Sequence, residues 1–177
     1  MENRIGFGPR LGAFLLDIIL VSVISVILVS VIGVGGAAAG AAVGGDDAMG
    51  AAAGMMGGFL GGIMASIIVV YIVTVVWFLL EGLIGATIGK MIVGIKIAND
   101  DGTKASIGKL ILRYAIKNVS SIFGILATLL SLKFLNTIGG LLGLVIFIGC
   151  FLVLGANKQS IHDMLAKTAV YKKSDIK

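Results

Sequence analysis

The first long apolar run of the chain, residues 11–33, carries an acid inside it, and this combination constrains the fold more than any other feature. A helical span needs about 20 consecutive apolar residues, so the run is long enough to cross a bilayer. The acid is Asp17. A carboxylate in hydrocarbon is costly, and such groups face a bundle interior or a wet cavity and have a partner. Asp17 is therefore the first candidate for a functional residue.

The composition indicates an integral membrane protein. Of the 177 residues, 58% are hydrophobic and 13% are charged, whereas soluble domains carry about 25% charged residues. The apolar runs are long and lack the alternating pattern of outer-membrane strands, which predicts helices rather than a barrel. The net charge is +5, and the basic residues flank these apolar runs. We therefore expect contact with membrane lipids and not with nucleic acid.

The order of the apolar runs predicts one membrane domain over residues 1–177. We expect about four transmembrane helices, over residues 11–33, 59–80, 119–135 and 138–156. A Gly/Ala-rich stretch separates the first two, and its middle should form a loop. Residues 105–135 could form either two pieces or one long kinked helix. The predicted fold class is all-α, a polytopic helical membrane protein.

Glycines mark the approach to the second span. Gly50, Gly54, Gly58 and Gly62 recur every four residues. Small residues at this spacing let two helix backbones approach closely. Packing within the bundle and contact between copies in a homo-oligomer are both compatible with this pattern.

The one substantial polar segment, residues 81–118, should contain a strand and a helix. Residues 91–97 read as a short strand that enters a turn at residues 99–102, giving a small β-hairpin-like loop. Ser106 could cap the helix that follows. Three basic residues of this helix recur every four positions and form one stripe: Lys109, Arg113 and Lys117. The stripe predicts an interfacial amphipathic helix on anionic headgroups, with packing on a soluble partner as the alternative.

The distribution of charge predicts the orientation in the cell membrane. Lys and Arg occur in the N-terminal residues, in segment 81–118 and in the tail, residues 157–177. The Gly/Ala-rich loop holds Asp46 and Asp47 and no base. The positive-inside rule therefore places both termini and segment 81–118 in the cytoplasm.

Three groups of residues resemble the RDD family of small membrane proteins. They are Arg10 with Asp17 in the first span, the run Thr87-Ile-Gly-Lys90 with its continuation to Arg113, and the run Gln159-Ser-Ile-His-Asp163. The resemblance covers nearly the whole chain. The family is named for one Arg and two Asp, and the resemblance implies that these are Arg10, Asp17 and Asp163. It also implies transport of a ligand, with cation/proton exchange as the most concrete form.

The residues themselves suggest how these charges are used. Arg10 and Asp163 should lie near the same membrane boundary, so we predict an ion pair between them. Asp17 is either a site for a proton or cation, because removal from water favours the protonated carboxyl, or a structural acid that ties helices together. Glu81 at a membrane boundary and His162, which could titrate near pH 6.5, are secondary candidates.

The remaining chemistry is limited by the residue types. The chain has one cysteine and one histidine, so we expect no metal site, no cofactor and no catalytic Ser/His/Asp arrangement. The protein is therefore not expected to be an enzyme. The leading hypothesis is a transporter in which Asp17 is the intramembrane site. We expect it to work as a homo-oligomer. The alternative is a membrane scaffold or accessory subunit that transports nothing.

Overall fold

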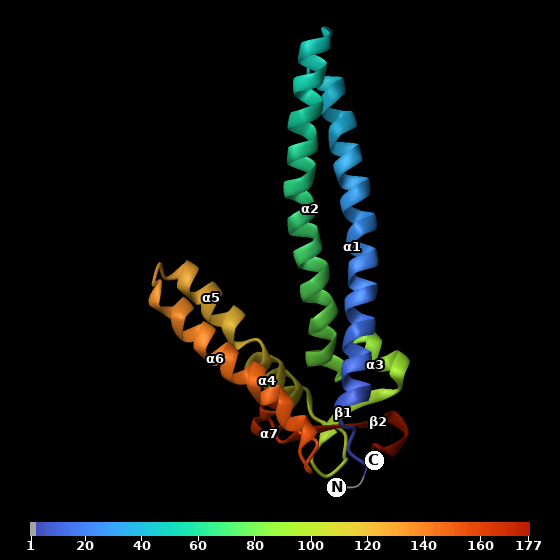
Figure 1. The fold of residues 1–177 in the computed structure, drawn as a ribbon, viewed down its shortest axis with the longest axis vertical. Coiled ribbons are helices and arrows are strands. Elements are labelled where there is room, and N and C mark those ends of the chain that lie inside the picture. Colours follow the sequence, from blue (N-terminus) through green and yellow to red (C-terminus); the bar gives the residue numbers. More distant parts are fainter. Residues whose placement is uncertain (1–2) are drawn as a thin grey trace. The chain divides into compact units, whose positions relative to one another are not determined.

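The computed structural model describes residues 3–177 and is 75% helical (Figure 1). Two long helices come first, α1 (Phe7–Val43) and α2 (Ala48–Ile84). The elements that follow are α3 (Ile88–Val93), β1 (Ile95–Asn99), α4 (Ile107–Lys117), α5 (Val119–Leu129), α6 (Phe134–Cys150), η1 (Phe151–Leu154), α7 (Ile161–Leu165), β2 (Thr168–Lys172) and η2 (Lys173–Asp175). The predicted class, an all-α helical membrane protein, is confirmed.

The chain divides into two compact units. One is the helical hairpin Ile18–Trp77. The other joins the described residues up to Asp17 with Phe78–Lys177. We call them the hairpin unit and the sheet unit, and describe each by itself.

In the hairpin unit, α1 and α2 are in backbone contact through their glycines. A Cβ atom added at Gly54 would overlap the carbonyl oxygen of Gly40, and one added at Gly58 would overlap that of Gly36. The close contact predicted from the glycine spacing is thus present within the chain. The loop that joins the two helices is confined to residues 44–47, so most of the Gly/Ala-rich stretch is helical.

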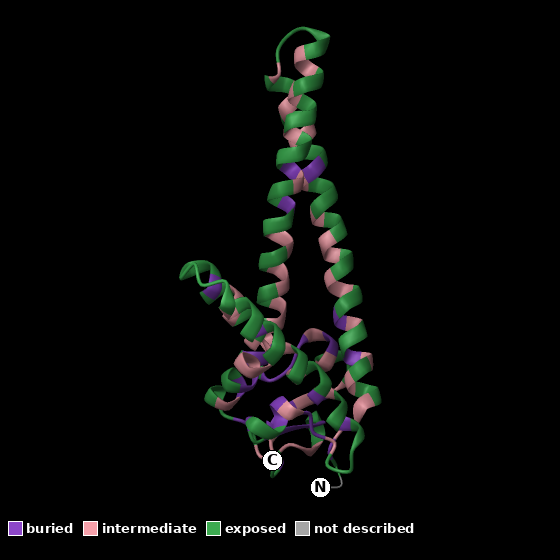
Figure 2. Ribbon diagram, turned by 60° about the vertical axis from the view of Figure 1, so that its left-hand side comes forward, coloured by how far each residue is buried: buried purple, intermediate pink, exposed green. Residues whose placement is uncertain are grey.

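The long helices expose apolar side chains over most of their surface, and Figure 2 shows few buried residues along them. Within residues 3–177, three helices are long and apolar enough to cross a membrane: Phe7–Val43, Ala48–Ile84 and Phe134–Leu154. With 37 residues each, α1 and α2 are about 55 Å long, well beyond the roughly 30 Å of hydrocarbon in a bilayer. Each contains one of the first two predicted spans.

The third predicted span, residues 119–135, is not one helix. Helix α5 ends at Leu129 after 11 residues, about 16 Å, which is too short to cross a bilayer alone. It follows α4 at a bend of 73°, and only the two together would make a fourth, broken span. Residues 105–135 therefore form separate pieces, the first of the two alternatives.

The sheet unit is built on an antiparallel pair of strands. The strand expected over residues 91–97 is confirmed only in its second half, because residues 91–93 end helix α3 and β1 begins at Ile95. The partner of β1 is β2 from the tail, with Ile97 opposite Val170. The two strands are thus not joined by the turn at residues 99–102. Ile95, Ile97 and Val170 pack with Leu110 of α4 and Ala13 of α1, so the tail is an integral part of this unit.

The glycine contact yields a prediction for the hairpin unit. We expect Gly54→Ala to lower the stability of the protein by about 1–3 kcal/mol, because the added methyl group forces the two backbones apart. Gly57→Ala is the matched control, since a Cβ there meets nothing within 4 Å and alanine favours the helix by up to about 1 kcal/mol. Thermal unfolding in detergent measures both, and equal melting temperatures for the two variants would contradict the packing.

Candidate functional site

Asp17 lies in α1 and is held by the start of the short helix α3. Its side chain is 1% exposed. Carboxylate oxygen Oδ2 accepts a hydrogen bond of 2.5 Å from Thr87 Oγ1, and Oδ1 accepts one of 2.7 Å from the backbone N–H of Gly89. Thr87 is the N-cap of α3, and its hydroxyl also accepts from the backbone N–H of Lys90. Asp17 thus completes the capping of α3 across 70 residues of sequence.

Gly89 allows this arrangement because it has no side chain. A Cβ atom at this position would overlap the carbonyl oxygen of Ala13 and lie 2.8 Å from the Asp17 carboxyl carbon. Helix α3 therefore lies directly against the backbone of α1. Any larger residue at position 89 would move Asp17 away from its two donors on α3.

Glu81, near the end of α2, is surrounded by cations. Its side chain is buried and forms ion pairs with Arg113 Nη1, with Lys90 Nζ at 3.1 Å and with Lys117 Nζ at 2.9 Å. Lys117 also lies over the ring of Phe78, 5.7 Å from its centroid. Glu81, a secondary candidate from the sequence, is in fact the acid on which three basic residues converge.

Asp163, on α7, is fully buried between two arginines. Oδ2 accepts from Arg10 Nη1 at 2.5 Å, which confirms the predicted ion pair, and Oδ1 accepts from Arg113 Nε at 2.6 Å. Arg10 also donates to the backbone oxygens of Ile5 and Lys158. The second arginine is a partner that the sequence did not reveal.

Arg113 joins these contacts into one network, which we call the ion network: Arg10, Glu81, Lys90, Arg113, Lys117 and Asp163. The Arg113 guanidinium contacts Asp163 through Nε, Glu81 through Nη1 and His162 Nε2 through Nη2 at 3.1 Å. Its rigid fork suits it to bridging two carboxylates. The network ties α1, α2, α3, α4 and α7 of the sheet unit to one another.

This environment sets the charge of the groups outside the spans. Burial alone would raise the pKa of Asp163, but attraction to Arg113 and Arg10 outweighs it and holds that pKa well below its usual range. Burial and the nearby Arg113 charge lower the pKa of His162 to about 3. Burial, partly opposed by Glu81, lowers the pKa of Lys90 to about 8. His162 is therefore neutral at pH 7 and does not titrate near pH 6.5 as the sequence suggested.

The basic residues of the α4 stripe contact other residues of the protein, and for the buried Arg113 the prediction of a contact with lipid headgroups is wrong. Arg113 is 3% exposed, Lys117 pairs with Glu81, and Lys109 donates to Asn99 Oδ1 at 2.9 Å. The exposed side of α4 is instead apolar: Ile107, Ile111 and Leu112. The helix is amphipathic as predicted, but its basic side turns inward because two buried acids lie there.

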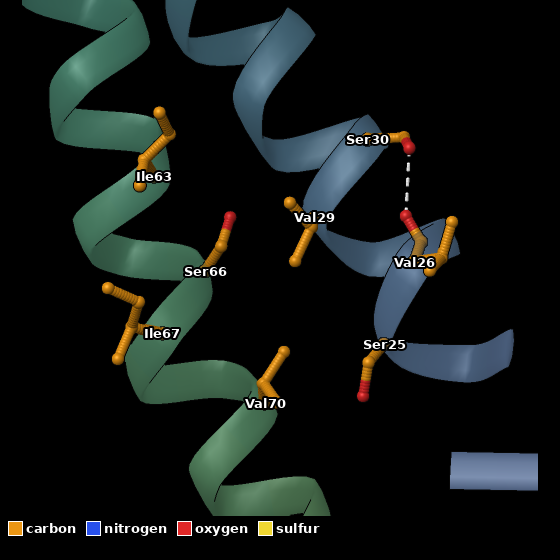
Figure 3. Close-up of a pocket in the computed structure, with 8 residues that line it drawn as sticks. All are labelled: Ser25, Val26, Val29, Ser30, Ile63, Ser66, Ile67 and Val70. Carbon is orange, nitrogen blue, oxygen red and sulfur yellow. Dashed lines mark hydrogen bonds between the residues drawn. The ribbon is translucent and has the colours of Figure 1, made fainter. Parts of the chain in front are cut away.

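A separate hollow of about 450 Å³ lies between α1 and α2 in the hairpin unit (Figure 3). Valine and isoleucine side chains make up most of its lining. The hydroxyls of Ser30 and Ser66 donate to carbonyl oxygens of their own helices, whereas Ser25 Oγ is buried with no hydrogen-bond partner in the described part of the chain. Within residues 3–177, no group of three or more His, Cys, Asp or Glu could hold a metal ion.

The ion network predicts a large cost for removing Arg113. We expect Arg113→Met to destabilise the protein by about 3–5 kcal/mol, because it leaves two buried carboxylates without their shared partner. Lys109→Met, on the same helix and stripe, removes only one hydrogen bond and should cost about 1 kcal/mol. Chemical unfolding in detergent compares the two; similar losses would show that the network is not what stabilises the sheet unit.

The neutral, buried His162 predicts a pH dependence of stability. Its pKa is about 3 when folded and about 6.5 when unfolded. Between these values the unfolded chain binds a proton that the folded chain does not, so the free energy of unfolding should fall as the pH falls from about 6.5 to about 5. The slope from this residue is at most about 1.4 kcal/mol per pH unit.

His162→Gln is the comparison for this pH dependence, since the chain has one histidine. The variant should lack this part of the slope, while the contribution of the carboxyl groups stays the same. Unfolding free energies measured from pH 7 to pH 5 give the difference. Parallel curves for the two proteins would mean that His162 has the same pKa in the folded and unfolded states, and would contradict its burial as a neutral group.

Comparison with known proteins finds a matching family model and a similar protein. The RDD family model matches residues 4–167, which include Arg10, Asp17 and Asp163. One similar protein is uncharacterized protein YxaI of Bacillus subtilis (strain 168), 30% identical over 101 residues, 54% of this chain and 52% of that protein. The chain thus spans about half the length of this relative. No solved structure matches the present chain. Since the family match covers nearly its whole length, the chain belongs to the RDD family.

Proposed function

We propose that this membrane protein is a transporter that exchanges a small cation for protons, with Asp17 as the carboxylate that binds each in turn. The observation that carries the proposal is the position of Asp17: a buried acid within an apolar helix long enough to span a bilayer. Intramembrane acids mark ion and proton pathways in many membrane proteins. The hydrogen bonds from Thr87 and Gly89 hold the carboxylate at a defined place against α3.

The ion network supports the proposal because it ties α1, which carries Asp17, and α3, which contacts it, to the rest of the sheet unit. Arg113 links α4 to the ends of α2 and α7, and Arg10, seven residues before Asp17 on α1, is clamped to Asp163. Both acids of the network are already paired with arginine. A proton or cation that reaches the sheet unit would therefore have to displace an arginine, which is always charged, to bind at Glu81 or Asp163.

Ion-driven pH change inside proteoliposomes tests the proposal. A sodium or potassium gradient should change the interior pH with wild type, and Asp17→Asn should abolish the change, since an amide carries no negative charge and takes up no proton in this pH range. Asp46→Asn is the matched control, because Asp46 is an exposed acid in the loop between α1 and α2. Absence of flux from inserted, folded wild type would reject cation/proton exchange, and full flux from Asp17→Asn would reject Asp17 as the site.

A membrane scaffold or accessory subunit is the second candidate, and a specific observation favours it. Asp17 caps α3 and the other acids clamp helix ends, which is what structural charges do. In that case wild type shows no flux, and Asp17→Asn lowers thermal stability or alters the elution volume in size-exclusion chromatography. A folded, unaltered Asp17→Asn protein that has lost flux would instead favour transport.

We further infer a multi-pass orientation in the cell membrane with both termini and segment 81–118 in the cytoplasm, and assembly as a homo-oligomer. The exposed lysines of the sheet unit support contact with anionic headgroups there, in place of the α4 stripe: Lys104, Lys167, Lys172, Lys173 and Lys177. Single cysteines at positions 46 and 173 in a Cys150→Ala background test the orientation. A membrane-impermeant thiol reagent added to intact cells should label position 46 and not position 173; the reverse would invert the topology.

A further inference from the structure

We infer that helix α3 couples Asp17 to the ion network, so that loss of the negative charge on Asp17 releases Lys90 from Glu81. Lys90 would then be a positioning residue whose ion pair reports the state of Asp17. The inference rests on the proposed role of Asp17 as an exchange site. It assigns a task to Lys90, which the exchange proposal leaves without one.

One end of α3 is held by Asp17. Thr87 and Gly89 both donate to its carboxylate, and the missing side chain of Gly89 lets α3 lie against α1. A hydrogen bond to an ionised acceptor is about twice as strong as one between neutral groups. A negative charge at the start of a helix also favours the helical conformation.

The residue directly after Gly89 carries the other contact. Lys90 Nζ lies 3.1 Å from Glu81 Oε1, with a side chain that is 12% exposed. Three charged groups on two other elements face it: Glu81 from α2, which attracts it, and Arg113 and Lys117 from α4, which repel it. Lys90 is thus kept among these neighbours by one ion pair and by the position of α3.

A helix of six residues has few contacts of its own to keep it in place. If Asp17 becomes neutral, its hold on the start of α3 weakens, and the repulsion from Arg113 and Lys117 favours movement of Lys90 toward water. The same six residues carry both contacts, so one cannot shift far without the other. The geometry therefore joins a charge change at Asp17 to an electrostatic change at Glu81.

Site-specific titration of Lys90 tests the coupling without any measurement of transport. The full chain is prepared in detergent with 13C-labelled lysine, and the Lys90 signal is assigned with Lys90→Arg. Its midpoint should lie near the pKa of about 8 in wild type. In Asp17→Asn, which mimics the neutral acid, we expect the midpoint to rise from this value toward the ordinary lysine pKa of about 10.4 as Lys90 gains water.

The direction of the shift separates release from simple electrostatics. If Lys90 stayed in place, removal of a nearby negative charge would leave its midpoint unchanged or lower it, and either result would overturn the inference. Thr87→Val breaks the same link from the side of α3 and should raise the midpoint too, which covers the case in which Asp17→Asn does not fold. Asp46→Asn should leave it at the wild-type value. Because titration needs no flux, this inference and the exchange proposal can fail independently.

Discussion

The sheet unit depends on one guanidinium group. Arg113 lies between Glu81 and Asp163, and each of these buried acids is tolerable only because it shares this neighbour and has a second cation of its own. Buried charges are costly unless they are paired with good geometry. Arg113 therefore determines where α2, α4 and α7 can lie within this unit, and Lys90 and Arg10 extend the same constraint to α3 and α1.

The hairpin unit depends on a different kind of contact, in which two helix backbones touch at glycines that have no side chains. Its helices touch where Gly36 and Gly40 meet Gly58 and Gly54, with no charge between them. In lipid, apolar side chains gain little by leaving their surroundings, so close backbone packing is what favours such a contact. The two units thus combine the two ways by which helices associate in a membrane protein, polar pairing and tight packing of small residues.

The apolar helices and the important charged residues are easier to predict from the sequence than the groups that contact them. The class, the apolar helices, the buried Asp17 and the Arg10–Asp163 pair could be predicted, because length, hydropathy and spacing report them directly. The donors to Asp17 could not, since a backbone N–H and a threonine hydroxyl 70 residues away carry no charge signature. The stripe on α4 shows the same limit: periodicity identifies a basic face, but the identical pattern suits water, headgroups or the buried Glu81. The run Thr87-Ile-Gly-Lys90 stood out only by its resemblance to the RDD family, and its residue pattern did not predict α3.

The pairing of β1 with β2 has a consequence for the order in which the protein forms. The hairpin unit is contiguous in sequence, so its helices can associate as soon as residues 18–77 have been synthesised. The sheet unit must wait for residues 161–172, which bring both Asp163 and the second strand. Until then Arg10 and Arg113 lack Asp163, their common acid. A nascent chain that stalls before α7 would leave Arg10 without its acidic partner and Glu81 as the one acid of the network for Lys90, Arg113 and Lys117. Such a chain should be a substrate for quality control even though every apolar helix in it is complete.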